Sequence, residues 1–206
     1  MKNQSSRSTP RVGITGGIGS GKSTVSRIFH EGLGIPIFNA DDWAKQLIHE
    51  DPVLRAGIID IFGSEAYTPE GEYNRPFVAK IVFSDPQKLA ALNALVHPAL
   101  EIAALQWHEQ QAALGCPYTL KEAAVMVESG SHLHLDFLIV VTAPEALRIQ
   151  RVIERDGLTE EQVRARMRGQ LPEEEKIKLA DFVIVNDGSQ MLLPQIWELH
   201  RKILGY

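Results

Sequence analysis

The sequence is poor in cysteine, in aromatic residues and in basic charge. Its 206 residues include one cysteine, Cys116, and 7% aromatic residues. A single cysteine excludes an internal disulfide, and Cys116 has no sequence neighbours with the spacing of a zinc site. We interpret Cys116 as a filler residue near a turn and expect a reduced, cytoplasmic setting.

Long apolar runs are missing as well. No run approaches the roughly 20 residues that cross a bilayer, so no membrane partner is expected. The opening MKNQSSRSTP is polar and lacks the apolar centre of a secretory signal, so residues 1–10 are interpreted as a disordered tail. The net charge of −5 argues against a general nucleic-acid binder, because such proteins carry broad basic surfaces. Any phosphate site should therefore be local.

The chain does contain short, β-rich apolar runs that alternate with helical stretches, a pattern typical of a parallel α/β sheet. A helix is expected after the first run, from about Lys22 to Glu31, and another closes the chain around Trp197. The five runs that predict strands are Val12–Thr15, Ile35–Phe38, Ala123–Val127, DFLIVVTAP from Asp136, and Phe182–Val185.

Two segments do not belong to this alternation. Residues 49–120 lack a convincing buried strand, so we expect a helical subdomain inserted beside the sheet. Residues 146–178 form another helical segment, which is crowded with arginine. The nucleotide-binding core is then expected to comprise residues 11–48, 121–145 and 179–206.

The stretch GITGGIGSGKST, from Gly13 to Thr24, holds five glycines in twelve residues. Residues 16–23 match the spacing G-x-x-x-x-G-K-[ST] of a phosphate-binding loop. Glycines let backbone N–H groups approach a phosphate, and the following helix adds the positive end of its dipole. Lys22 can reach the β and γ phosphates, and the Ser23 hydroxyl can ligate Mg²⁺. A strand before the loop and a helix after it favour a bound nucleoside triphosphate with magnesium over a turn that binds nothing.

A GTPase would share this loop. The sequence contains no Asn-Lys-x-Asp motif to read guanine, and NADD from Asn39 is not one. No switch-like D-x-x-G follows a suitable strand either. These absences favour a small kinase.

Asp41 and Asp42 follow the second expected strand, at the sheet edge where ligands bind in open α/β folds. A carboxylate there could accept a proton from an attacking hydroxyl or hold Mg²⁺ through water. The alternative is helix capping, since an aspartate directly before WAKQLIHE is a good N-cap. We expect capping to explain one of the pair and assign the functional role to Asp41.

The arginine-rich segment could serve as a lid. Arg148, Arg151 and Arg155 have the spacing of one helical face. Arg164, Arg166 and Arg168 follow closely. The alternative is a solvated face paired with neighbouring glutamates. A triphosphate loop in the same chain favours the lid, because phosphoryl transfer needs cations over the moving phosphate and exclusion of water.

Several segments together resemble the dephospho-coenzyme A kinases. They are TGGIGSGKST, NADD, FSDPQKLAALNALVHPAL and ADFVIVNDGS, and the similarity runs from Val12 to the last helix. It implies an α/β P-loop kinase fold, with a five-stranded parallel sheet flanked by helices, a helical substrate-binding insertion and a helical lid. It also implies that ATP phosphorylates the ribose 3′-hydroxyl of dephospho-CoA, the last step of coenzyme A synthesis.

The resemblance implies roles for individual residues. The family's Asp-Ala-Asp maps to Asn39-Ala40-Asp41, which makes Asp41 the expected base beside the catalytic Lys22. The lid corresponds to Arg148–Gln170, and the loop Asn186–Gly188 lies where related kinases place adenine. ATP is then expected to contact Gly17, Gly19, Ser20, Gly21, Lys22, Ser23, Thr24, Arg151 and Asn186.

The acceptor side is implied by the same resemblance. Arg75 precedes PFVAKIVF, and Asn93 and His97 belong to a Leu-Asn-x-x-x-His-Pro pattern in the insertion, which would be the CoA-binding subdomain. His97 could instead be a packed structural residue, or mark a helix junction before proline. Glu128 is retained after Ala124–Met126, where the family usually has Pro-Leu-Leu, so we expect the third strand to end at the site.

One departure leaves two alternatives open. Asn39 stands where the family has its first aspartate, and an amide cannot act as a base, so that role falls on Asp41. The rivals are another small P-loop kinase acting on a nucleoside or nucleotide, and a nucleotide- or CoA-binding regulator without catalysis. We expect ATP, dephospho-CoA and Mg²⁺ as partners of a monomer or small homo-oligomer.

Overall fold

The computed structural model describes residues 9–205, and the predicted tail lies outside them except for its last two residues. The chain divides into two compact units. The first comprises the described residues up to Asn39 and those from Trp107 onward, and the second is Ala40–Gln106. The expected insertion of residues 49–120 therefore differs from the second unit at both ends.

The first unit is built on a five-stranded, wholly parallel sheet, which confirms the predicted fold class. The strand order is β2-β3-β1-β4-β5, so β1 lies in the middle of the sheet between β3 and β4. The strands are β1 (Arg11–Thr15), β2 (Ile37–Asn39), β3 (Thr119–Glu122), β4 (Phe137–Thr142) and β5 (Phe182–Val185).

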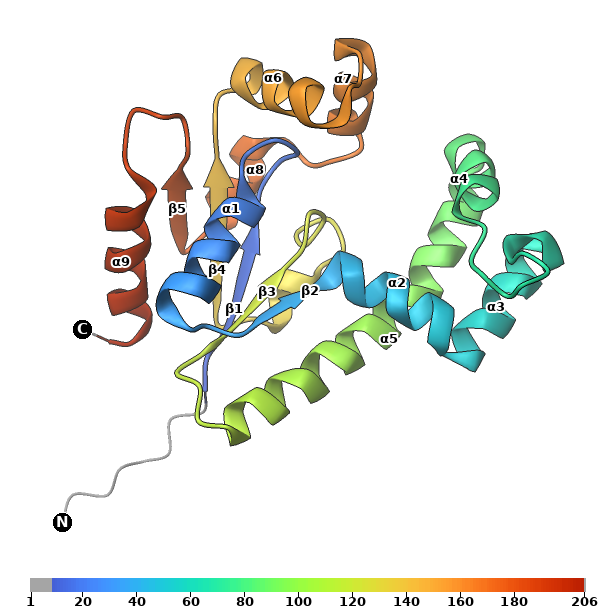
Figure 1. Ribbon diagram of the computed structural model, residues 1–206, viewed down its shortest axis with the longest axis horizontal. Helices are drawn as coiled ribbons and strands as arrows, with labels where there is room; N and C mark the ends of the chain where they lie inside the picture. Colours follow the sequence, from blue (N-terminus) through green and yellow to red (C-terminus); the bar gives the residue numbers. More distant parts are fainter. Residues whose placement is uncertain (1–8, 206) are drawn as a thin grey trace. The chain divides into compact units, whose positions relative to one another are not determined.

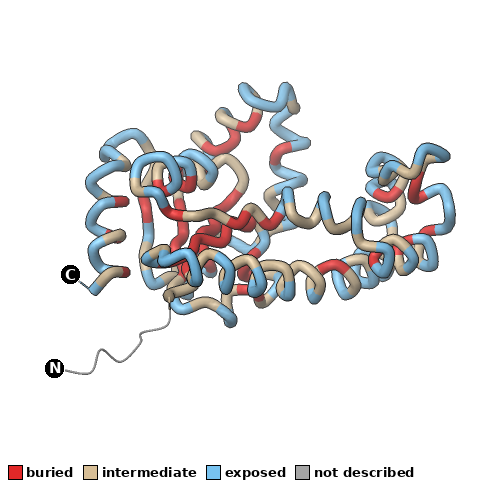
Figure 2. Tube along the Cα trace, turned by 60° about the horizontal axis from the view of Figure 1, so that its bottom comes forward, coloured by how far each residue is buried: buried red, intermediate tan, exposed pale blue. Residues whose placement is uncertain are grey.

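Helices cover this sheet and stand over its carboxyl edge. In Figure 1, α1 lies in front of the sheet, α8 lies behind it, and α6 and α7 stand beyond the tips of the strand arrows. Buried residues concentrate in the strands and on the inner faces of the helices (Figure 2). The helices are α1 (Lys22–Arg27), a π-helical turn (Ile28–Gly32), a 3₁₀ turn (Ser131–His134), α6 (Glu145–Asp156), α7 (Glu160–Arg168), α8 (Glu173–Leu179) and α9 (Leu192–Ile203).

The third strand was predicted at the wrong residues. The apolar run Ala123–Val127 forms a turn, and the strand is the preceding Thr119–Glu122, whose four residues are all buried. Met126 is fully buried, and a side chain added at Gly13 of β1 would meet its sulfur atom. The apolar run is therefore a turn beside β1, in which Ala123, Met126 and Val127 are buried and Val125 is exposed. The second strand is also shifted, from Ile35–Phe38 to Ile37–Asn39.

The second unit is helical and has its own core. Its elements are α2 (Ala40–Glu50), α3 (Pro52–Phe62), a 3₁₀ turn (Ser64–Ala66), α4 (Arg75–Ser84) and most of α5 (Pro86–Ala113). Ile58 and Tyr67 are among the buried side chains of its core, against which Leu92 and Leu95 of α5 pack. Asp51 caps α3 by accepting hydrogen bonds from two backbone N–H groups of its first turn.

Helix α5 continues through Pro98 without ending, so His97-Pro98 is not a helix junction. Among the described residues, α5 alone is long and apolar enough to cross a membrane by length and composition, with a mean hydropathy of 1.3 over 18 residues. The sequence prediction did not identify this segment, because polar residues interrupt its apolar residues and it contains no long continuous apolar run. One such helix is weak support for a membrane span, because core helices pass the same test.

Candidate active site

The glycine loop joins β1 to α1 at the carboxyl edge of the sheet. Gly19 and Gly21 have φ of 80° and 88°, left-handed backbone conformations that residues with a side chain rarely adopt. Ser20 N–H donates to the Gly17 carbonyl at 3.0 Å, and Gly21 accepts from the N–H groups of Thr24 and Val25 as the N-cap of α1. The loop is thus a compact turn whose following helix presents its N-terminus, the arrangement that binds phosphate.

Lys22, Ser23 and Glu122 form a connected polar group beside this loop. Lys22 Nζ lies 2.6 Å from Glu122 Oε1, and the Ser23 hydroxyl donates to the same oxygen at 2.8 Å. Glu122 ends β3 and is 5% exposed, and it pairs in register with Ile14 of β1 and Asn39 of β2. A buried carboxylate therefore holds the lysine and the serine that follow the glycines.

The charge state of Glu122 follows from these contacts. Burial alone would raise the pKa of the Glu122 carboxyl, but the Lys22 ammonium and neighbouring serine hydroxyls together hold that pKa below its usual value. The sequence prediction missed Glu122 because it placed the third strand at Ala123–Val127, directly after the residues that form it. The available signal was an acidic residue two positions after the β-prone Tyr118-Thr119-Leu120.

We predict that Glu122 makes folding stability depend on pH. Because the folded-state pKa is lowered, the ionised carboxylate stabilises the fold above its unfolded value of 4.5, and this contribution is lost as pH falls through the folded pKa. Urea unfolding of the protein and of Glu122→Gln should differ most at neutral pH and converge on acidification. A difference that is constant with pH, or that grows in acid, would contradict this assignment.

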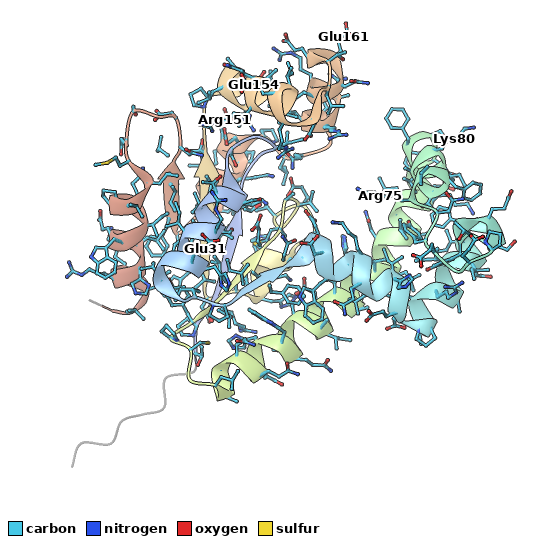
Figure 3. All side chains as sticks on the ribbon, viewed as in Figure 1. Glu31, Arg75, Lys80, Arg151, Glu154 and Glu161 are labelled. Atoms are coloured by element: carbon cyan, nitrogen blue, oxygen red, sulfur yellow. The ribbon has the colours of Figure 1, made fainter. Side chains whose placement is uncertain are left out.

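Two arginines of α6 reach the glycine loop. Arg148 is 7% exposed, and side chains added at Gly17 and Gly19 would collide with its guanidinium and its backbone. Arg151 Nη1 lies 3.5 Å from the Gly19 carbonyl, and Figure 3 shows Arg151 on the side of α6 nearest the loop. The close approach of α6 explains why these two loop positions lack a side chain.

Three other arginines of α6 and α7 pair with acidic residues of the same two helices. Arg155 and Arg166 both contact Asp156, and Arg164 bridges Glu145 and Glu160 at 2.6 and 2.8 Å. A cavity of about 860 Å³ lies among α6, α7, α8 and the carboxyl ends of β4 and β5. The lid segment is therefore divided between α6, which contacts the loop, and α7, whose Arg164 and Arg166 pair with nearby acidic residues.

Asn186 connects the loop after β5 to the glycine loop. Its side-chain amide donates to the Ser20 carbonyl at 2.8 Å, and a side chain added at Gly21 would collide with it. Its backbone N–H donates to Thr142 at the end of β4. Gly188, two residues further, has a φ of 86°. The expected adenine loop thus adjoins the phosphate loop directly.

The remaining predicted residues, apart from Glu128, lie in the second unit. Asp41 and Asp42 are exposed in the first turn of α2, which begins at Ala40, so the N-cap role expected for one of them is wrong. Their charges still suit the positive end of the helix dipole, and Asp42 binds Lys45 at 2.7 Å. Arg75 begins α4, and Asn93 and the half-buried His97 lie on α5 (Figure 3 labels Arg75).

Glu128 does not end a strand, contrary to expectation, but lies in the turn after β3. Its Oε1 accepts hydrogen bonds from Lys176 Nζ at 2.8 Å and from Leu171 N–H at 2.9 Å. Both partners belong to the predicted lid segment, residues 146–178. The structure therefore joins Glu128 to the lid.

The residues after the glycines fit a magnesium ion. Within residues 9–205, no group of three His, Cys, Asp or Glu side chains could form a metal site by itself. Magnesium bound to a nucleotide needs few protein ligands, because phosphate oxygens and waters complete its coordination. The Ser23 hydroxyl and the Glu122 carboxylate, 2.8 Å apart, are hard oxygen donors of the right kind.

A parallel sheet with this strand order, a glycine loop leading into Lys22 and Ser23, and an arginine-bearing lid define a P-loop kinase of the small-molecule class. The family model described as "Dephospho-CoA kinase" matches residues 11–191. The dephospho-CoA kinase of Chlorobaculum tepidum is 41% identical over 198 residues, 94% of each chain. That of Bacteroides fragilis (strain YCH46) is 37% identical over 189 residues, covering 92% of this chain and 90% of its own.

Structural similarity agrees with the sequence. The dephospho-CoA kinase from Campylobacter jejuni superposes with a TM-score of 0.70 at 27% identity, over 95% of this chain and 97% of that one. The chain belongs to the dephospho-CoA kinase family. It is an enzyme that uses ATP to phosphorylate the ribose 3′-hydroxyl of dephospho-CoA, giving coenzyme A and ADP.

Proposed function

We propose that the phosphoryl group passes directly from ATP to the ribose 3′-hydroxyl, with no covalent enzyme intermediate. In this proposal Lys22 and the N–H groups from Gly19 to Thr24 hold the triphosphate, and Asp41 orients and deprotonates the hydroxyl. The observation that carries it is the Lys22–Ser23–Glu122 group beside the glycine loop. Phosphoryl transfer needs mainly positioning and electrostatic stabilisation, which such a group supplies.

The contact with Glu122 orients the Lys22 side chain. Its pairing with a buried carboxylate at 2.6 Å fixes the side chain alongside the loop before nucleotide binds. A cation that is already oriented loses little freedom when charge develops on the phosphate in the transition state. We assign Glu122 to positioning Lys22 and Ser23, beyond the residues that the sequence had suggested.

Asp41 is the proposed base by its place in the chain. It follows β2 by two residues, at the carboxyl edge of the sheet where ligands of open α/β folds bind. Asn39, the last residue of β2, is an amide and can orient a hydroxyl without removing its proton. Asp42, which is bound to Lys45, has no catalytic role in this proposal.

Magnesium, ligated by Ser23 and supported by Glu122, would neutralise charge on the β and γ phosphates when bound. Arg148 and Arg151 are the lid cations that contact the loop, and we assign them to the phosphate chain. We assign Asn186 to the adenosine side, and Arg75, Asn93 and His97 to dephospho-CoA in a CoA-binding second unit. The single cysteine supports a cytoplasmic setting. We further propose that the protein is a monomer or small homo-oligomer that binds neither nucleic acid nor membranes.

The test of this function is the choice of acceptor. ADP release, coupled to an indicator reaction, should depend on dephospho-CoA and be far slower with a panel of nucleosides and nucleoside monophosphates. Equal rates with a nucleoside monophosphate would favour another small P-loop kinase. No ADP release with any acceptor, while ATP still binds, would favour a regulator without catalysis.

A further inference from the structure

Gln170 lies in the short connection between α7 and α8, and its side chain contacts two distant segments. Its Oε1 accepts a hydrogen bond from the backbone N–H of Ile18, in the glycine loop, at 2.9 Å. Its Nε2 lies 3.5 Å from the carbonyl of Ala124, in the turn after β3, at the outer limit of a hydrogen bond. One amide thus connects the lid, the phosphate loop and the turn after β3.

Ile18 contacts the lid in a second way. Its side chain packs against an apolar cluster whose buried members are Ile149 and Val152 of α6 and Val163 of α7. The backbone N–H and the side chain of one loop residue therefore both depend on where the lid lies. Ile18 is the point at which a displacement of the lid would reach the phosphate loop.

An ion pair between a fully buried lysine and a half-buried glutamate fixes the base of the lid. Lys176 of α8 is fully buried, and its Nζ contacts Glu128 Oε1 at 2.8 Å and the Ala124 carbonyl at 3.4 Å. Glu128 also accepts from Leu171 N–H, directly after Gln170. A buried ammonium is costly unless it is paired, so this contact constrains α8 against the turn after β3. Gln170 and Lys176 meet at the same carbonyl, that of Ala124.

We propose that Gln170 is a positioning residue that sets the conformation of the phosphate loop for ATP, and that the Glu128–Lys176 pair holds Gln170 in place. Gln170 acts through the Ile18 N–H and not on the reacting atoms. Glu128 thereby serves the lid rather than dephospho-CoA. This inference rests on the proposed function, because it requires the glycine loop to bind the triphosphate.

Steady-state kinetics of Gln170→Ala test the proposal. Loss of the hydrogen bond to the loop should lower kcat/KM for ATP about tenfold while leaving KM for dephospho-CoA unchanged. The matched control is Gln150→Ala, because Gln150 is an exposed glutamine of α6 whose amide donates to Glu154 of the same helix, and it should behave as the unaltered enzyme. Unchanged ATP kinetics in Gln170→Ala would overturn the proposal.

Replacement of both charged residues by neutral ones tests the Glu128–Lys176 pair. Glu128→Gln combined with Lys176→Met removes both charges and avoids leaving one of them unpaired. This double variant should show the same loss in kcat/KM for ATP, and adding Gln170→Ala should lower it little further, because the three residues act as one unit. Full additivity, or equal losses toward both substrates with a lower Tm, would indicate a merely structural pair and overturn its positioning role.

Failure here is distinguishable from failure of the proposed function. Lys22→Ala, measured in the same assay, should lose turnover whether or not Gln170 positions the phosphate loop. Retained turnover in Lys22→Ala would contradict the role of the loop itself. Retained ATP kinetics in Gln170→Ala, with turnover lost in Lys22→Ala, would overturn only the link from the lid.

Discussion

Replacement of Lys22 by alanine is expected to lower kcat/KM for ATP roughly 10²–10³-fold, the loss typical of removing one oriented transition-state donor. Lys22 is the cation that directly follows the glycines, and it already lies 2.6 Å from a buried carboxylate. Steady-state ADP release at saturating dephospho-CoA measures the effect. Turnover near that of the unaltered enzyme would contradict the role of the loop.

A control is needed because Lys22→Ala also leaves Glu122 buried without its cation. Breaking a buried pair in this way typically costs about 3–5 kcal/mol, so activity could fall through unfolding alone. The double variant Lys22→Met with Glu122→Gln removes both charges and should recover most of the free energy of unfolding. Its activity should stay low. Recovery of activity together with stability would mean that Lys22 acts only through folding.

Asp41→Asn is expected to lower kcat about 10²–10⁴-fold, the usual contribution of a general base, with little change in KM for ATP. The amide keeps the size of the side chain and can still accept a hydrogen bond, but it cannot take the proton. Binding of dephospho-CoA, measured by titration calorimetry, should be retained, because the change affects the chemical step.

Asp42→Asn is the matched control for this substitution. Asp42 is the adjacent carboxylate in the same first turn of α2, also exposed, and bound to Lys45. It should retain nearly full turnover. Equal losses in the two variants would point to a shared effect on the start of α2. A loss confined to Asp42→Asn would move the base to that residue.

The parts of the fold set by short-range signals could be predicted from the sequence. The glycine spacing located the phosphate loop, because a tight turn before a helix requires those residue types. β4 was found because a strand covered on both faces is continuously apolar. β3 was misplaced for the opposite reason. It buries Lys121, which donates a hydrogen bond to Ser131, and Glu122, which pairs with Lys22. Both partners belong to other elements of the chain, so the local sequence does not show that these polar residues can be buried.

The links within the site were beyond the reach of sequence reasoning. Nothing in the local sequence indicates that Gln170 bonds to Ile18, or that Lys176 is fully buried against Glu128. Both depend on how α7 and α8 return to the sheet. The arginines illustrate the same point, because Arg151 and Arg155 share a helical face, yet Arg151 reaches the loop and Arg155 pairs with Asp156.

The most direct test of direct transfer from ATP to dephospho-CoA is the stereochemical course at phosphorus. ATP made chiral at the γ-phosphoryl group with oxygen isotopes would be turned over with dephospho-CoA, and the 3′-phosphate of the product analysed by ³¹P NMR. A single in-line displacement predicts inversion of configuration at that phosphorus. Retention would require an even number of displacements, and therefore a phosphorylated enzyme intermediate, and would contradict the account.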